Sequence, residues 1–225
     1  MAQTLNDIIR AAESKGYTID KRPYKLNLIG VRNSAATDQK KFDDQIAYFY
    51  YDNNGTLVGK VATATTDPST YFLNEPMNPK GAAILQAGEY KDTWRIGLHR
   101  GKYKALVQVK PVTVIRDDDR NSYINYFAPT QTGLFGINIH RASLTKNNVT
   151  EIGQDSAGCQ VFQNASDFNS MMGMAETSRT KHGNKFSYIL IDDRDAIKLR
   201  NTTLLVVGAG IIGFAAYLFF KKPKK

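Results

Sequence analysis

The chain has 225 residues, of which 42 % are hydrophobic and 11 % aromatic, so general disorder is excluded and one packed domain with an appendage is expected. The formal net charge is +9, but four of the lysines responsible stand in the last five residues, which leaves +5 on the rest of the chain. This excess favours an anionic partner such as a phospholipid surface or a cell-wall polymer, whereas no finger spacing, RNP-type aromatic motif or basic recognition helix indicates nucleic acid.

Residues 1–20 predict a short amphipathic helix. Leu5, Ile8, Ile9 and Ala12 follow the i, i+3, i+4, i+7 spacing of one helix face, and Gly16 is a typical stop signal. The segment lacks the basic start and the continuous apolar run of a signal peptide, so we do not expect it to be one.

Residues 21–195 are predicted to form a mainly β domain. Strand-like runs occupy 25–31, 45–51, 56–64, 82–88, 104–115, 133–140 and 186–192. The sequence DNNG at 52–55 is a hairpin signal, and 166–176 reads as a short helix. Many short strands with few helices favour a β-sandwich or a curled sheet with small helical additions.

Residues 196–225 are expected to form a separate C-terminal segment. Its stretch 204–220 holds 17 uncharged, mostly apolar residues and precedes the sequence KKPKK. A helix of that length spans about 26 Å, close to the hydrocarbon core of a bilayer, so we expect a transmembrane-type helix. Its three glycines match G-x-G-x-x-G, but no acidic residue follows, so a nucleotide site is not expected. They would instead suit close helix packing and self-association.

Cys159 is the only cysteine, so it cannot form an internal disulfide. A lone cysteine is most often a small buried hydrophobe. Here it follows the small residues Ser156, Ala157 and Gly158, which would let the backbone approach a ligand, and His140 stands 19 positions upstream. A cysteine and a histidine brought together form a nucleophile and its base, so the pattern predicts an activated thiol.

Other polar residues carry weaker signals. His99 is interpreted as a strand-end surface histidine, although a second site group at this position is an alternative. No His/Cys cluster has the spacing of metal ligands, so neither a metal nor another cofactor is expected.

The segments INIHRAS and DSAGCQVF resemble the active-site region of L,D-transpeptidases of the YkuD type, in which a histidine is followed some 15 to 20 residues later by a Ser-x-Gly-Cys turn. The matching residues are His140, Ser156, Gly158 and Cys159. The wider stretch 24–192 is similar to a group of proteins encoded by tailed bacteriophages, through the segments LIGVRN, HRGKYKALVQ, GINIHRA and SAGCQVF.

This resemblance implies a YkuD-like fold and a cysteine enzyme that acts on peptidoglycan stem peptides. Cys159 would attack the carbonyl of a diamino acid, His140 would act as base and then as acid, and the amides of Gly158 and Cys159 would hold the oxyanion. Arg141 replaces the small residue common after the family's histidine, and Gln160-Val161 replaces the family's usual Ile-Arg or Leu-Asn. Arg141 is a candidate for a substrate carboxylate, with an ordinary surface ion pair as the alternative.

Several alternatives remain at the level of sequence. The thioester could be resolved by an amine, which gives cross-linking, or by water, which gives cleavage. The domain could also be a non-catalytic phage virion or ejected protein that retains the fold, or a membrane-active module. The expected location is membrane-associated, in the host cell envelope or the phage virion, and the lysines on both sides of 204–220 leave the orientation of the helix undecided.

Overall fold

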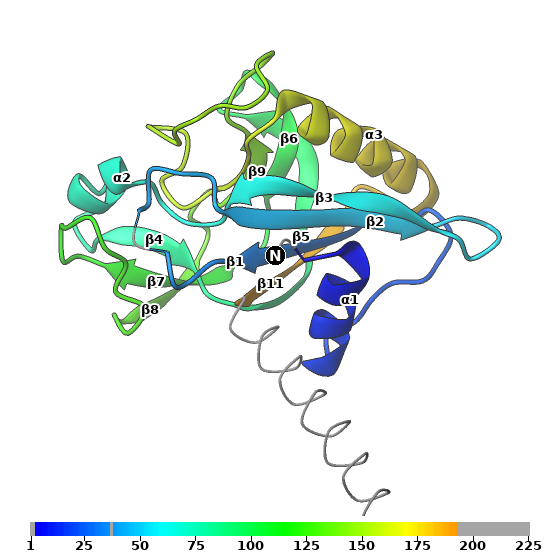
Figure 1. The fold of residues 1–225 in the computed structure, drawn as a ribbon, viewed down its shortest axis with the longest axis horizontal. Coiled ribbons are helices and arrows are strands. Elements are labelled where there is room, and N and C mark those ends of the chain that lie inside the picture. The colour runs from blue at the N-terminus through cyan, green and yellow to red at the C-terminus, as the bar shows by residue number, and fades with distance from the viewer. Residues whose placement is uncertain (1–2, 37, 193–225) are drawn as a thin grey trace, which may run out of the picture.

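The computed structural model describes residues 3–36 and 38–192, which form a mainly β structure (Figure 1). In this part of the chain eight strands close into a barrel and three form a separate sheet. The barrel strands are β1 (Asn27–Arg32), β2 (Asp44–Tyr51), β3 (Leu57–Thr65), β5 (Gly88–His99), β6 (Tyr103–Gln108), β9 (Ile139–Arg141), β10 (Gln160–Phe162) and β11 (Phe186–Asp192). The small sheet holds β4 (Ala82–Leu85), β7 (Val112–Asp117) and β8 (Thr130–Gly133), and the helices are α1 (Leu5–Ser14), α2 (Thr70–Asn74) and α3 (Ala165–His182).

The barrel has the strand order β1-β11-β5-β6-β9-β10-β3-β2. Its β1–β11 and β9–β10 pairs are parallel, and the other pairs are antiparallel. The mainly β class predicted from the sequence is therefore confirmed. Of the two predicted forms, a β-sandwich or a curled sheet, the curled sheet describes the structure better, because its eight strands close into one barrel.

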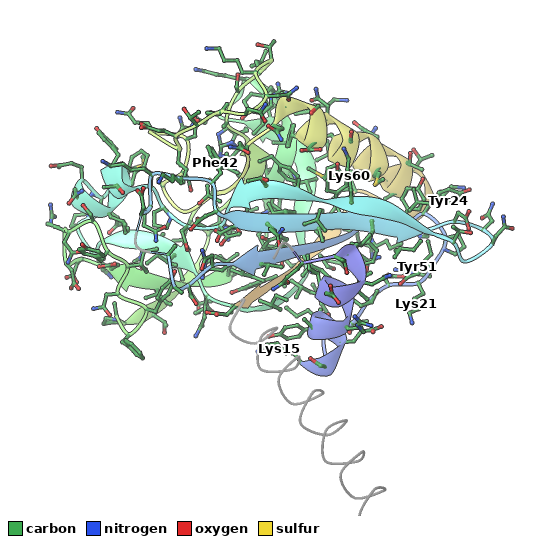
Figure 2. All side chains as sticks on the ribbon, in the orientation of Figure 1. Lys15, Lys21, Tyr24, Phe42, Tyr51 and Lys60 are labelled. Carbon is green, nitrogen blue, oxygen red and sulfur yellow. The ribbon has the colours of Figure 1, made fainter. Side chains whose placement is uncertain are left out.

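The barrel interior holds the main hydrophobic core. Trp94, Tyr188 and Phe162 are fully buried there, and α3 adds Phe168 and Met171 from outside the sheet. The rings of Phe162 and Phe168 meet edge to face at 5.9 Å, which fixes α3 close to β10. Figure 1 shows α3 lying along β2 and β3, and in Figure 2 Lys60 projects from β3 to the same helix, where its ammonium pairs with Asp167 at 2.9 Å.

The predicted N-terminal helix is confirmed as α1. Thr4 caps it, because its side chain accepts the amide of Asp7 while the Asp7 carboxylate accepts the amide of Thr4. Ile8, Ile9 and Ala12 then pack on the outer face of β1, β2 and β11. Every residue of β1 is buried as a result, since one face points into the barrel and the other lies under α1.

Two predicted strands are each divided in the structure. The run 104–115 separates into β6 and β7 at Pro111, which lacks an amide for a ladder hydrogen bond. The run 133–140 separates into β8 and β9, with Gly136 at φ 73° between them. The longest strand, β5, was not predicted; it carries several charged residues and bends at Asp92, which has φ 51°.

The predicted transmembrane-type helix at 204–220 lies outside the described residues. Within residues 3–36 and 38–192, no helix has the length and apolar character needed to cross a bilayer.

Candidate active site

His140 and Cys159 lie on neighbouring strands of the barrel. β9 and β10 run parallel with His140 opposite Val161, and Cys159 stands immediately before β10. The backbone of Gln160 donates to the carbonyl of Asn138 at 2.9 Å, which fixes the register of this strand pair next to Cys159. The fold therefore places these two residues, 19 positions apart in the sequence, on adjacent segments of the barrel wall.

The Cys159 thiol is half-buried and has two backbone partners. The amide of Asn138 donates to Sγ over 3.5 Å, and the thiol donates to the carbonyl oxygen of Gly136 over 3.4 Å. Burial raises the pKa of the Cys159 thiol, and the Asn138 amide opposes this rise only in part. This direction favours a protonated thiol at neutral pH, and the activation of Cys159 expected from the sequence stays a prediction.

His140 is 3 % exposed and has one well-defined tautomer. Its Nδ1 lies 3.0 Å from the carbonyl oxygen of Arg141, which can only accept, so Nδ1 carries the proton. Its Nε2 is buried and has no hydrogen-bond partner among the described residues. Burial, helped by the neighbouring His99, lowers the pKa of His140 to about 3. The lowered pKa favours a neutral ring, although backbone groups of Arg141 and Asp155 oppose the fall.

His99 is part of this site, and its interpretation as a surface residue is wrong. It is 6 % exposed, and its ring stacks on that of His140 with the centroids 4.1 Å apart. The Asn138 carboxamide oxygen accepts the amide of Gln108 at 3.0 Å, so its NH₂ group faces His99 Nδ1, also at 3.0 Å. His99 Nδ1 therefore accepts and its Nε2 carries the proton, the opposite tautomer to His140.

The position of His99 follows from the β5–β6 hairpin. His99 ends β5 and Tyr103 begins β6, and the two pair across a turn in which Arg100 and Gly101 both have positive φ. The Tyr103 hydroxyl lies 3.3 Å from His140 Nδ1. The sequence HRGKY contains a recognisable turn, but without β5 it gave no means of placing His99 beside His140.

Ser156 and Gly158 build the turn before Cys159. The buried Ser156 hydroxyl lies 2.7 Å from the carbonyl oxygen of Asp67 and 2.9 Å from that of Cys159, and it accepts the amide of Gly158 at 3.2 Å. Gly158 has φ 120°, and a methyl group on it would overlap the carbonyl oxygen of Ala83. The small residue thus permits a close approach to the protein's own backbone, and of the two amides expected to hold an oxyanion only that of Cys159 lacks a partner among the described residues.

A buried ionic network of Arg32, Asp67 and Asp44 lies next to the turn formed by Ser156 and Gly158. Arg32 Nε lies 2.7 Å from an Asp67 carboxylate oxygen, and both side chains are almost fully buried. Asp44 lies beside them and accepts the amide and the hydroxyl of Thr66. Burial raises the pKa of Asp67 to about 7, although Arg32 opposes the rise. Because the carbonyl of Asp67 also faces Ser156, the network is connected to the Cys159 turn.

Arg141 is held by aromatic rings. Its guanidinium lies 4.6 Å from the Tyr103 ring centroid and 5.4 Å from that of Phe168, and it donates to Asn169 at 3.0 Å. Its Nε is buried without a hydrogen-bond partner among the described residues. In this part of the chain Arg141 makes no ion pair with a carboxylate, so the surface ion pair weighed from the sequence is not observed.

A cavity of about 180 Å³ opens beside His140. Its ionisable lining side chains are His99, Arg100, Lys102, Tyr103, His140, Arg141 and Asp155. With both imidazoles neutral, three permanent cations face a single carboxyl group there. Cys159 is not part of the lining, so the cavity lies on the His140 side of the pair.

No three His, Cys, Asp or Glu side chains converge as metal ligands within residues 3–36 and 38–192. No protein-family model matches the chain, and no curated protein matches it either.

Proposed function

We propose that the chain is a cysteine-dependent, YkuD-like enzyme that transfers or hydrolyses acyl groups of peptidoglycan stem peptides. The observation that carries this proposal is the buried, unpartnered Nε2 of His140 on the strand next to Cys159. A buried acceptor without a partner costs about 1–3 kcal/mol, so its retention favours a functional role. The likeness of the segments around His140 and Cys159 to L,D-transpeptidases indicates the substrate class.

The first step starts from a neutral pair. The Cys159 thiol donates to Gly136 and not to His140, so its side chain must rotate before Nε2 can accept the proton. The sulfur then bonds to the substrate carbonyl carbon, and the bond from that carbon to the departing amine breaks as His140 returns the proton to the amine. This leaves a thioester on Cys159.

The second step resolves the thioester. An acceptor amine or water attacks the carbonyl carbon and His140 takes the proton of the attacking group. The carbon–sulfur bond then breaks as His140 passes that proton to the sulfur. The amine gives a cross-linked product and water a cleaved one. In this proposal the Cys159 amide, which has no partner among the described residues, donates to the oxyanion, and one such donor contributes about 3 kcal/mol to catalysis.

The neutral resting pair also favours a second candidate function. A non-catalytic phage virion or ejected protein that retained the fold would tolerate a protonated thiol bonded to a backbone carbonyl, as observed for Cys159. In both cases we propose that residues 204–220 attach the domain to a membrane, in the host envelope or through the virion, because that stretch is uncharged and followed by lysines.

The test is acylation of Cys159 followed by product analysis. A carbapenem-type agent should add covalently to the wild-type protein and not to Cys159→Ser, as read by intact mass. Mass spectrometry of stem peptides after incubation with the protein then separates cross-linking from cleavage. No adduct and no change in the stem peptides would favour the non-catalytic function.

A further inference from the structure

We propose that His99 is a ligand-binding residue, whose Nε2–H group donates a hydrogen bond to a carboxylate held in the cavity beside His140. The inference deepens the proposed function and rests on it in one respect, because the carboxylate is assigned to the peptide substrate of the same site. The binding itself requires neither the Cys159 thiol nor a change in the charge of His140.

Asn138 determines which nitrogen of His99 carries the proton. A backbone amide can only donate, so the Gln108 amide fixes the carboxamide oxygen of Asn138 on its own side, at 3.0 Å. The NH₂ group of Asn138 then faces His99 Nδ1 at 3.0 Å and donates to it. The backbone of Asn138 is held as well, since its carbonyl oxygen accepts the Gln160 amide at 2.9 Å. The His99 ring is therefore kept with a bare Nδ1 and a proton on Nε2.

The Nε2–H group of His99 is a donor without a partner. Within residues 3–36 and 38–192 it makes no hydrogen bond, and unlike Nε2 of His140 it is not fully enclosed. The ring lines the cavity, and its direction is fixed by stacking on His140, with the centroids 4.1 Å apart, and by contact with Tyr103. A donor that is held in one direction at a cavity wall is suited to orient a ligand, because little freedom is lost on binding.

The rest of the lining indicates that the ligand group is a carboxylate. Arg100 and Lys102 line the cavity without an ion-pair partner among the described residues. Arg141 donates through Nη1 to Asn169, whereas its Nε and Nη2 make no hydrogen bond in this part of the chain. The edge formed by Nε and Nη2 matches the two oxygens of a carboxylate. Asp155 is the one carboxyl group that faces these three cations.

Two substitutions of His99 separate hydrogen bonding from packing. His99→Phe keeps an aromatic ring against His140 but has no donor, whereas His99→Gln loses the ring and keeps an N–H donor near the position of Nε2. If His99 binds a ligand, His99→Gln should retain most of the affinity and His99→Phe should lose it. If His99 only packs, the order of the two variants should be reversed.

The experiment titrates N-acetylglycine into the full-length Cys159→Ser protein in detergent, at pH 7 and constant ionic strength, and follows the ¹⁵N-labelled histidine rings by NMR. Before the titration, His99 should show a protonated Nε2 and a bare Nδ1. The ligand should shift the signals of His99 and of His140, and the latter serve as the readout in the His99 variants. N-acetylglycinamide, a neutral ligand of the same shape, should bind about tenfold more weakly, as should N-acetylglycine to His99→Phe.

A matched pair of double variants tests the cations. Arg100→Gln/Lys102→Gln should weaken the binding of N-acetylglycine, whereas Lys80→Gln/Arg95→Gln, which removes the same charge at exposed positions outside the cavity lining, should bind as wild type.

Three results would refute the inference: a bare Nε2 on His99 in the wild-type spectrum, equal affinity of the two ligands, or equal affinity of wild type and a folded His99→Phe. The first two need no His99 variant, so they decide the matter even if that variant does not fold. Inorganic phosphate that binds as tightly as N-acetylglycine would refute the assignment to a carboxylate.

The outcome is separable from that of the proposed function. Binding of N-acetylglycine without a carbapenem adduct on the wild-type protein would support the His99 site and count against acyl transfer. An adduct without such binding would support acyl transfer and refute the His99 site.

Discussion

Gly158→Ala tests how tightly the turn before Cys159 is constrained. At φ 120° an alanine is strained by about 1–3 kcal/mol. Its methyl group would also overlap the Ala83 carbonyl oxygen and lie 3.3 Å from Ile137 Cδ1. Overlap with a backbone atom cannot be relieved by a side-chain rotation, and such overpacking costs about 1–3 kcal/mol more. We therefore expect a loss of about 4 kcal/mol from a total stability of about 5–15 kcal/mol.

Gly153→Ala is the matched control, since it lies in the same loop at φ 54° with nothing within 4 Å of the added methyl. It should cost about 1 kcal/mol. Urea denaturation gives the free energies of unfolding, and the thermal midpoints should fall by about 8–16 °C for Gly158→Ala and about 2–4 °C for the control. Equal losses in the two variants would show that the approach to Ala83 does not constrain the turn.

Three further predictions concern the site and the tail. Because burial raises the pKa of Cys159, iodoacetamide should modify it more slowly than a model thiol at pH 7 and faster as the pH rises above about 8.5; a thiol that already reacts faster than the model at pH 7 would contradict the neutral resting pair. Burial lowers the pKa of His140 to about 3, so between about pH 3 and 6.5 the unfolded chain binds a proton that the folded chain does not. The free energy of unfolding of wild type, relative to that of His140→Asn, should therefore rise with pH in this window by up to about 1.4 kcal/mol per pH unit. Parallel pH profiles of the two proteins in urea titrations would rule this out. The full-length chain should bind phospholipid vesicles, whereas residues 1–201 alone should stay in solution with the same reactivity of the Cys159 thiol. A full-length chain that remains soluble and monomeric without detergent would argue against 204–220 as a membrane anchor.

The sequence predicted the fold best where local signals and tertiary packing agree. α1 and β11 were placed well, because a capped amphipathic helix and a compact apolar run are both local features. β5 could not be predicted, since its charged residues and the bend at Asp92 become compatible with a strand only through its pairing with β6 and β11. Barrel closure depends on the pairing of β1 with β11, which no local pattern indicates.

In the candidate site, too, the features with a local sequence signal were predicted and those that depend on tertiary contacts were not. Spacing and resemblance selected His140 and Cys159, and the strand register pairs His140 with Val161, two residues after Cys159. The role of His99 required the stacking distance and the orientation of the Asn138 amide, which are tertiary facts. The close contact between Gly158 and the backbone of Ala83 could not be predicted from the sequence either. A glycine next to a cysteine looks the same in a sequence whether its backbone faces a ligand or a neighbouring strand.

The parallel pairing of β1 with β11 has a consequence for the order of folding. Ile29 pairs with Ile189, so closure joins segments near the two ends of the described chain. Closing a loop of that length costs about 4.5 kcal/mol of chain entropy, and contacts so distant in sequence slow the folding rate. During synthesis, His99, His140 and Cys159 leave the ribosome before the strand that completes the barrel. Resistance of a nascent chain to proteases should therefore appear only after residue 192 has emerged, although the candidate site residues are made earlier.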